Sequence, residues 1–145
     1  MFLKILDKLG RKKLIYDRSH NHHKYHEKKP WMNRYFLLFK LRPKWFPFNI
    51  IMHEMFSDDE GDAVHNHSGP FISIMLRGGY WETRKNGKYW RKPGSIGYIS
   101  GDTLHRVDLE PGKKPLTLVI AGPFKKKPQD LYHRDFTTKM DKNYS

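Results

Sequence analysis

Residues 63–84 read AVHNHSGPFISIMLRGGYWETR, and this stretch indicates the fold. It contains three short runs rich in apolar, aromatic and β-branched residues, separated by Gly, Pro and Ser, over residues 63–67, 71–77 and 80–84. Runs of this kind, bounded by turn residues, are typical of consecutive β-strands. Gly78-Gly79 tolerates positive φ and therefore predicts a tight turn between two antiparallel strands.

The same pattern continues on both sides of this stretch. Five further strands are predicted, over residues 33–40, 49–56, 95–99, 105–109 and 116–121. Asn86-Gly87 is the strongest turn signal in the chain, because both residues accept the φ that a hairpin requires. Eight short strands, with no helical segment of comparable weight among them, predict an all-β barrel or sandwich.

The two ends of the chain differ from this strand-rich body. Apolar residues over 1–9 recur at helical spacing and predict a short helix that ends at Gly10. Residues 11–29 are rich in Lys, Arg, His and Tyr without a clear period, which predicts an arm lacking regular structure. We therefore expect a basic helix and arm, a barrel and a loosely attached polar tail, over 1–29, 30–124 and 125–145.

The composition limits the partners and the chemistry. With 145 residues, one hydrophobic core is expected. The chain has 28 Lys and Arg against 15 Asp and Glu, a formal charge of +13 that attracts anionic partners. These cations are spread over 4–28, 84–92 and 113–127, so a solvated basic surface is favoured over nucleic-acid binding, which remains an alternative.

Two absences complete the expectations from composition. Without cysteine, the chain has neither a disulfide nor a thiolate ligand, so any metal is held by nitrogen and oxygen, and a cytoplasmic location is expected. The apolar residues near the N-terminus are interrupted by charge, and no continuous 18-residue apolar run follows. We therefore expect no export signal and no membrane partner.

Three histidines are the strongest functional signal. Period-two geometry in the predicted strand 63–67 places His65 and His67 on one face, about 6.6 Å apart along the strand. His105 begins another predicted strand, and an antiparallel neighbour can bring it opposite this pair. The pattern predicts one metal ion bound by His65, His67 and His105.

These residues resemble the two motifs of the cupin superfamily, G-x5-H-x-H-x(3,4)-E-x6-G and G-x5-P-x-G-x2-H-x3-N, over residues about 61–109. His65 and His67 match the paired histidines, and Gly78 or Gly79 matches the closing glycine of the first motif. In the second motif Gly94 is in register and His105 matches the histidine. The resemblance implies a jelly-roll barrel, the double-stranded β-helix, with one divalent metal in it.

The chain also departs from both motifs. Gly61 lies only four residues before His65, and the motif glutamate falls on Phe71 or Ile72. The Pro, Gly and Asn of the second motif are replaced by Ser100, Asp102 and Leu109. Three neutral imidazoles without the glutamate leave the charge of a divalent metal uncompensated, which favours an anionic ligand. In this the chain is similar to the cupin thiol dioxygenases, which hold iron on three histidines, so Fe²⁺ is favoured over Mn²⁺, Ni²⁺, Zn²⁺ and Cu²⁺.

Four further residues are candidates for catalysis and substrate binding. Glu82 and Tyr80 share strand parity, so both are expected to face the metal as acid–base groups, with Glu82 also a candidate fourth ligand. The alternative is an exposed Glu82 paired with Arg84 or Lys92. Arg77 and Arg106 flank the two motifs and are candidates to bind a substrate carboxylate or phosphate, unless they are ordinary surface arginines.

A second group of histidines lies in the basic arm. These residues could bind a further metal, but they lack rigid strand spacing, so an incidental histidine-rich surface is favoured; they are His20, His22, His23 and His26.

Three functions remain open from the sequence. The first is a mononuclear non-haem iron dioxygenase acting on a small anionic substrate. The second is a sugar or keto-acid isomerase or epimerase, in which Glu82 moves a proton beside a metal-polarised carbonyl. The third is a non-enzymatic barrel that binds a small ligand or nucleic acid. A homodimer formed by sheet packing or by exchange of N-terminal strands, with residues 31–39 involved, is also an open alternative.

Overall fold

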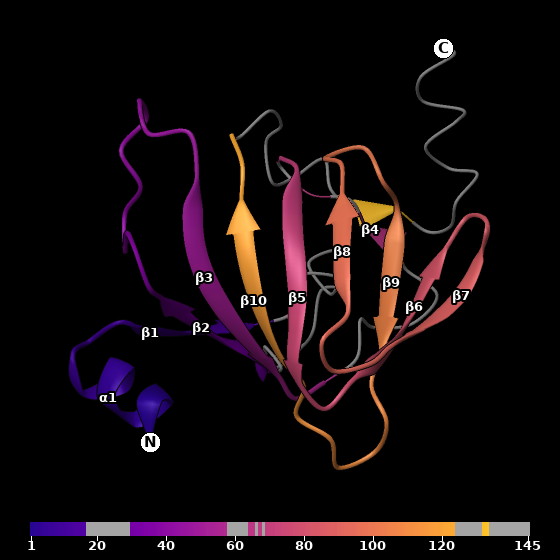
Figure 1. Ribbon diagram of the computed structural model, residues 1–145, viewed down its shortest axis with the longest axis horizontal. Helices are drawn as coiled ribbons and strands as arrows, with labels where there is room; N and C mark the ends of the chain where they lie inside the picture. The colour runs from indigo at the N-terminus through magenta and orange to yellow at the C-terminus, as the bar shows by residue number, and fades with distance from the viewer. Residues whose placement is uncertain (17–29, 58–63, 66, 68, 124–131, 134–145) are drawn as a thin grey trace, which may run out of the picture.

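The computed structural model describes residues 1–16, 30–57, 64–65, 67, 69–123 and 132–133. This part of the chain contains one short helix and eleven strands (Figure 1). Their bounds in chain order are α1 (Phe2–Lys8), β1 (Lys12–Tyr16), β2 (Pro30–Phe36), β3 (Asn49–Met55), β4 (Val64–His65), β5 (Phe71–Arg77), β6 (Tyr80–Arg84), β7 (Gly87–Arg91), β8 (Ile96–Ile99), β9 (His105–Asp108), β10 (Leu116–Ala121) and β11 (Tyr132–His133).

The strands form two sheets. Sheet A has six strands in the order β1-β2-β3-β10-β5-β8, and sheet B has five in the order β11-β4-β9-β6-β7. All of the neighbouring strands run antiparallel. Strands far apart in sequence are neighbours, as when β10 lies between β3 and β5 (Figure 1). This confirms the all-β jelly-roll barrel predicted from the sequence.

The inner faces of the two sheets meet in an apolar cluster. Met32, Met55 and Met75 project from sheet A and pack with Tyr80 and Val107 from sheet B. Met75 is the most deeply buried of these side chains, at 1% exposure. Because alternate residues of a strand face opposite sides, the cluster identifies which positions of each strand face the barrel interior.

A second cluster covers the outer face of sheet A. Leu6 of α1 is buried there against Tyr35, Met52 and Leu116. The helix ends as the sequence predicts, because Gly10 takes a φ of 66° and the next amide donates to the Leu6 carbonyl at 2.9 Å. The N-terminal helix therefore packs on the barrel as part of the fold.

Three strands, β1, β7 and the two-residue β11, were not predicted, and β2 lies over residues 30–36 instead of the predicted 33–40. Residues 12–16, expected to lack regular structure, form β1 and pair with β2 at the edge of sheet A. Their exposed lysines fit an edge strand, where charge discourages further pairing. Residues 87–91, left without a strand, form β7 and pair with β6, with the Trp81 and Trp90 rings 5.2 Å apart. The remaining arm, including His20 to His26, lies outside the described residues, as does the predicted tail apart from 132–133.

Within the described part of the chain, no helix has the length and apolar character needed to span a membrane.

The apolar cluster between the sheets should dominate stability. Met75→Ala removes a side chain that is 1% exposed, and we expect it to lower the free energy of unfolding by about 2–5 kcal/mol. Ile96→Ala on the outer face, at 70% exposure, is the control and should change it by less than about 0.5 kcal/mol. Urea denaturation of the three proteins measures both values, and equal midpoints would contradict the assignment of the core.

Candidate metal centre

The candidate site lies in the middle of sheet B. Strand β9 is placed between β4 and β6, and its first residue, His105, is paired in backbone register with His65 on one side and Arg84 on the other. Two of the three predicted ligands are therefore on adjacent strands, as the sequence predicted. The side chain of His65 is not among those described.

A turn and a loop bring His67 to His105. Before β9, the Thr103 amide donates to the Ser100 carbonyl at 3.1 Å, and the two hydroxyl groups lie 2.8 Å apart. Gly101 at the tip of this turn lies against the loop that carries His67: a Cβ added there would be 3.3 Å from the His67 carbonyl oxygen. The absence of a side chain at Gly101 thus permits the close approach of the loop and the turn.

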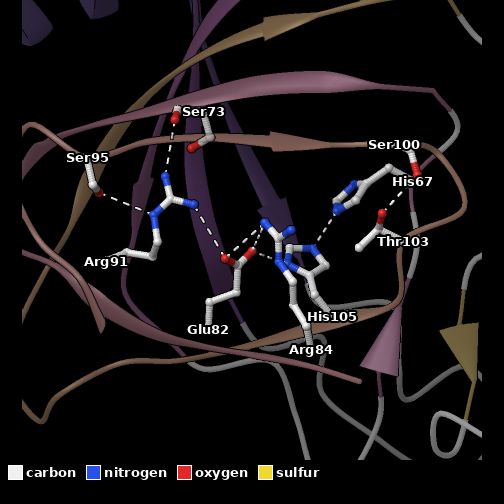
Figure 2. Close-up of polar contacts among 9 residues, drawn as sticks. All are labelled: His67, Ser73, Glu82, Arg84, Arg91, Ser95, Ser100, Thr103 and His105. Atoms are coloured by element: carbon white, nitrogen blue, oxygen red, sulfur yellow. Dashed lines mark hydrogen bonds and ion pairs between the residues drawn. The ribbon is translucent and has the colours of Figure 1, made fainter. Parts of the chain in front are cut away.

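The imidazole rings of His67 and His105 point at each other. Their Nε2 atoms are 2.7 Å apart, and the ring centroids are separated by 5.0 Å (Figure 2). His105 is only 4% exposed, and the edge-on ring of Phe71 packs 4.6 Å from the His67 ring. Two ring nitrogens, one from each histidine, therefore converge on one point at the inner face of the barrel.

This donor arrangement fits a shared metal ion. Metal–nitrogen bonds of about 2.0–2.1 Å place two adjacent imidazole nitrogens about 2.8–3.4 Å apart around an octahedral or tetrahedral ion. The 2.7 Å between His67 and His105 needs to widen by only a few tenths of an ångström to reach that range. Among the described side chains no group of three metal-ligating residues is present. His65, the remaining predicted ligand, is paired with His105 in backbone register.

Glu82 lies behind His105 and contacts its other ring nitrogen. Its Oε1 is 2.9 Å from Nδ1 of His105, and its side chain is almost fully buried (Figure 2). Both carboxylate oxygens also accept hydrogen bonds from Arg84, at 3.2 and 3.4 Å, and Oε2 accepts one from Arg91 at 3.4 Å. The structure thus places Glu82 inside the barrel and paired with Arg84, where it can orient His105 as carboxylates do behind metal-ligating histidines.

The charges around Glu82 keep it ionised. Burial alone would raise its pKa, but the hydrogen bond from His105 and the charges of His105, Arg84 and Arg91 together outweigh burial. They lower the pKa of Glu82 from 4.5 to about 2. A carboxylate that stays ionised can accept a hydrogen bond from Nδ1–H of His105, and in the neutral imidazole this tautomer has its lone pair on Nε2.

The other predicted residues lie elsewhere. Tyr80 is buried in the apolar cluster between the sheets. Arg77 is half exposed and donates to Glu54 at 2.9 Å. Arg106 follows His105 in β9, so its side chain leaves the opposite face, where it binds Asp108 through Nε at 2.9 Å and Nη2 at 2.8 Å. The structure does not bring either arginine to the histidine pair; Arg84 lies beside it instead.

One residue of the cluster was not found from the sequence. Arg91 is buried, and its guanidinium contacts Glu82, the Ser95 hydroxyl at 3.2 Å and the Ser73 carbonyl at 3.2 Å. The only available signal was the parity of the hairpin, which sets Arg91 opposite Tyr80 in the register. That signal required β7 to be recognised as a strand.

The comparisons with known proteins concern the fold. No family model and no curated protein matches the sequence. Solved structures do match: a cupin-2 domain protein from Rhodospirillum rubrum (12% identity, TM-score 0.60, covering 92% of this chain and 82% of that one), the polyketide cyclase RemF from Streptomyces resistomycificus (18%, 0.52, 67% and 67%) and FeII HppE (11%, 0.53, 77% and 57%). The chain therefore has the cupin fold that its histidine motifs predicted.

The buried carboxylate makes stability depend on acid pH. Because the pKa of Glu82 is lower in the folded protein than its ordinary 4.5, its contribution is present above pH 4.5 and is lost as the pH falls toward 2. The full shift corresponds to at most about 3 kcal/mol. We expect the free energy of unfolding of metal-free wild type to fall more steeply from pH 6 to pH 3 than that of Glu82→Gln. Urea denaturation at each pH measures both, and parallel profiles would contradict the assignment.

Proposed function

We propose that this chain is a metal-dependent cupin enzyme that binds one divalent ion, Fe²⁺ in preference to Mn²⁺, Ni²⁺, Zn²⁺ or Cu²⁺, through His65, His67 and His105. The observation that carries this proposal is the pair of converging Nε2 atoms of His67 and His105, 2.7 Å apart, with a carboxylate behind one of them. The metal would supply Lewis acidity and, if it is iron, the capacity to react with dioxygen.

The residues of the chain have separate tasks in this proposal. Glu82 accepts a hydrogen bond from Nδ1–H of His105 and holds the ring in the orientation in which Nε2 faces His67. The Phe71 ring and the closely packed turn at Gly101 limit the movement of His67. The buried setting of His105 limits the access of water to the ligand atoms.

The charge of the site favours an anionic substrate. One carboxylate, Glu82, is surrounded by two guanidinium groups, Arg84 and Arg91. A divalent ion on neutral histidines adds positive charge, which a carboxylate or phosphate of the substrate would offset. Arg84 is the better placed cation, because its side chain is 26% exposed and, among the described residues, only its Nη2 donates a hydrogen bond. Nε and Nη1 remain as donors for an oxyanion of the substrate.

Dioxygenase activity is the more specific part of the proposal. The absence of a glutamate ligand leaves the site to three histidines, and FeII HppE shows that a protein of similar fold holds iron(II). Oxygenation of a small thiol or carboxylate is therefore the first reaction to test.

A second function is favoured by the same short contact. At 2.7 Å, the two Nε2 atoms of His67 and His105 are also at hydrogen-bond distance, so Glu82, His105 and His67 form a chain along which a proton can be held. Without a metal ion between the histidines, such a chain suits the general base of an isomerase or epimerase of a sugar or keto acid.

Metal content distinguishes these functions. We expect protein purified without added metal, or reconstituted anaerobically with Fe²⁺, to contain one ion per chain by elemental analysis. The His67→Ala/His105→Ala variant should lose it, because two ligands are removed. The control variant, in which His20, His22, His23 and His26 of the arm are all alanine, should retain it. Absence of metal from wild type after reconstitution would contradict the metal-dependent function and leave the proton-transfer function.

Arg84 provides a test of the substrate class. Once oxygen-uptake screens with thiols and small carboxylates identify a substrate, Arg84→Met should raise its KM about 10- to 150-fold, because a charge-assisted hydrogen bond worth about 1.5–3 kcal/mol is lost. Arg106→Met, on the outer face, is the matched control and should leave KM unchanged. Equal KM values for wild type and Arg84→Met would show that Arg84 does not bind the substrate.

A further inference from the structure

Arg91 connects the two sheets through the interior of the barrel. It belongs to β7 of sheet B, and its side chain is 9% exposed. Its Nη2 donates to the Ser73 carbonyl on β5 of sheet A at 3.2 Å, and its Nε donates to the hydroxyl of Ser95, just before β8, at 3.2 Å (Figure 2). Its third contact is Nη1 to Oε2 of Glu82 at 3.4 Å. One guanidinium thus ties sheet A to the carboxylate that holds His105.

Gly97 provides the space for this guanidinium. It lies on β8 opposite Ser73, with its α-carbon directly beneath Arg91. A Cβ added at Gly97 would lie 2.7 Å from Cζ and 2.8 Å from Nη2 of Arg91, and closer still to Nη1. Gly97 does not have a positive φ, so backbone conformation alone does not require glycine there. What excludes a side chain at Gly97 is the position of Arg91.

The contacts of Glu82 divide between its two oxygens. Oε2 receives the buried Arg91, while Oε1 faces Nδ1 of His105. Arg84 contacts both oxygens, but its side chain is a quarter exposed and therefore a weaker restraint. Arg91 is held by sheet A on its other side, so it is the contact that fixes the direction of the carboxylate.

We propose that Arg91, seated over Gly97, is a positioning residue that directs Oε1 of Glu82 at Nδ1 of His105 and so selects the ring tautomer that presents Nε2 to the metal. This inference rests on the proposed metal-binding function, but the tautomer of His105 can be measured without metal. In this proposal, Ser73 and Gly97 of sheet A, with Ser95 just before β8, hold Arg91 in place. Through Arg91 and Glu82 they determine the tautomer of His105, which belongs to sheet B.

The experiment uses two readouts on the full chain. Nitrogen-15 NMR of metal-free protein reports which ring nitrogen of His105 carries the proton, and calorimetric titration with Co²⁺, a redox-stable probe, reports the Kd. The variants are Arg91→Ala, Arg91→Lys, Gly97→Ala and the double variant Arg91→Ala/Gly97→Ala. Arg106→Ala controls for the loss of an arginine, and Met75→Ala controls for a loss of stability without a change in the polar cluster.

The expected results follow from the geometry. Wild type should carry the proton on Nδ1, whereas Arg91→Ala and Gly97→Ala should show a mixture of tautomers and a Kd weaker by about 10- to 100-fold. Arg91→Lys, which retains the charge, should recover part of the loss. Gly97→Ala should weaken the Kd less than about twofold in the Arg91→Ala background, because the group that it displaces is already gone. Both controls should keep the wild-type tautomer and Kd.

Three outcomes would overturn the inference. An unchanged tautomer and Kd in Arg91→Ala would show that Arg84 alone positions Glu82. Full additivity of the two substitutions would show that Gly97 does not act through Arg91. An equally weakened Kd for Co²⁺ in Met75→Ala would show that the effect comes from lower stability of the fold and not from the position of Arg91. If Arg91→Ala does not fold, Arg91→Lys and Gly97→Ala test the same proposal. If wild type binds no Co²⁺, the proposed function fails, but the NMR measurement of the His105 tautomer still tests the role of Arg91.

Discussion

The burial of one carboxylate constrains the rest of the site. An ionised Glu82 inside the barrel is tolerated only if charges and hydrogen-bond donors replace the water it has lost. Its partners come from three adjacent strands, because Glu82 and Arg84 lie on β6, Arg91 on β7 and His105 on β9. Sheet B can therefore place His105 and the carboxylate of Glu82 together only when these three strands are in their observed register.

Two kinds of contact join the sheets inside the barrel, the apolar cluster and the polar contacts around Glu82, and they have different roles. Where Met75, Tyr80 and Val107 meet, the contact is apolar. It stabilises the packing of the two sheets without requiring a particular bond geometry. Around Glu82 the contact is polar, and each hydrogen bond has a preferred geometry. Arg91 links the sheets as the apolar cluster does, and it also donates to the carboxylate that contacts His105. A site built on strands in this way is held more firmly than one built on loops.

Most of the strands could be predicted from local patterns. Strands β5, β6 and β10 have the bounds expected from their apolar runs and the glycines beside them. Strand β1 was missed because its lysines match the basic arm that follows, and it is a strand only because β2 lies beside it. Strand β7 was missed because Lys88, Tyr89 and Trp90 are all exposed, so polar and apolar residues do not alternate. In both cases the pairing with a neighbouring strand outweighed the local pattern.

The sequence by itself determined which residues share a face of a strand, and through its histidine motif which strands carry the candidate ligands, because period-two alternation and motif spacing are local properties. Parity predicted that Glu82 and Tyr80 share a face, but it left open whether that face is the interior; only the structure shows that Glu82 is buried. Only the tertiary structure decided that its carboxylate stands behind His105, that Arg77 and Arg106 bind carboxylates of this chain, and that Arg91 lies over Gly97. Those contacts depend on how two sheets pack and twist against each other, a relation among residues far apart in sequence that no local pattern encodes.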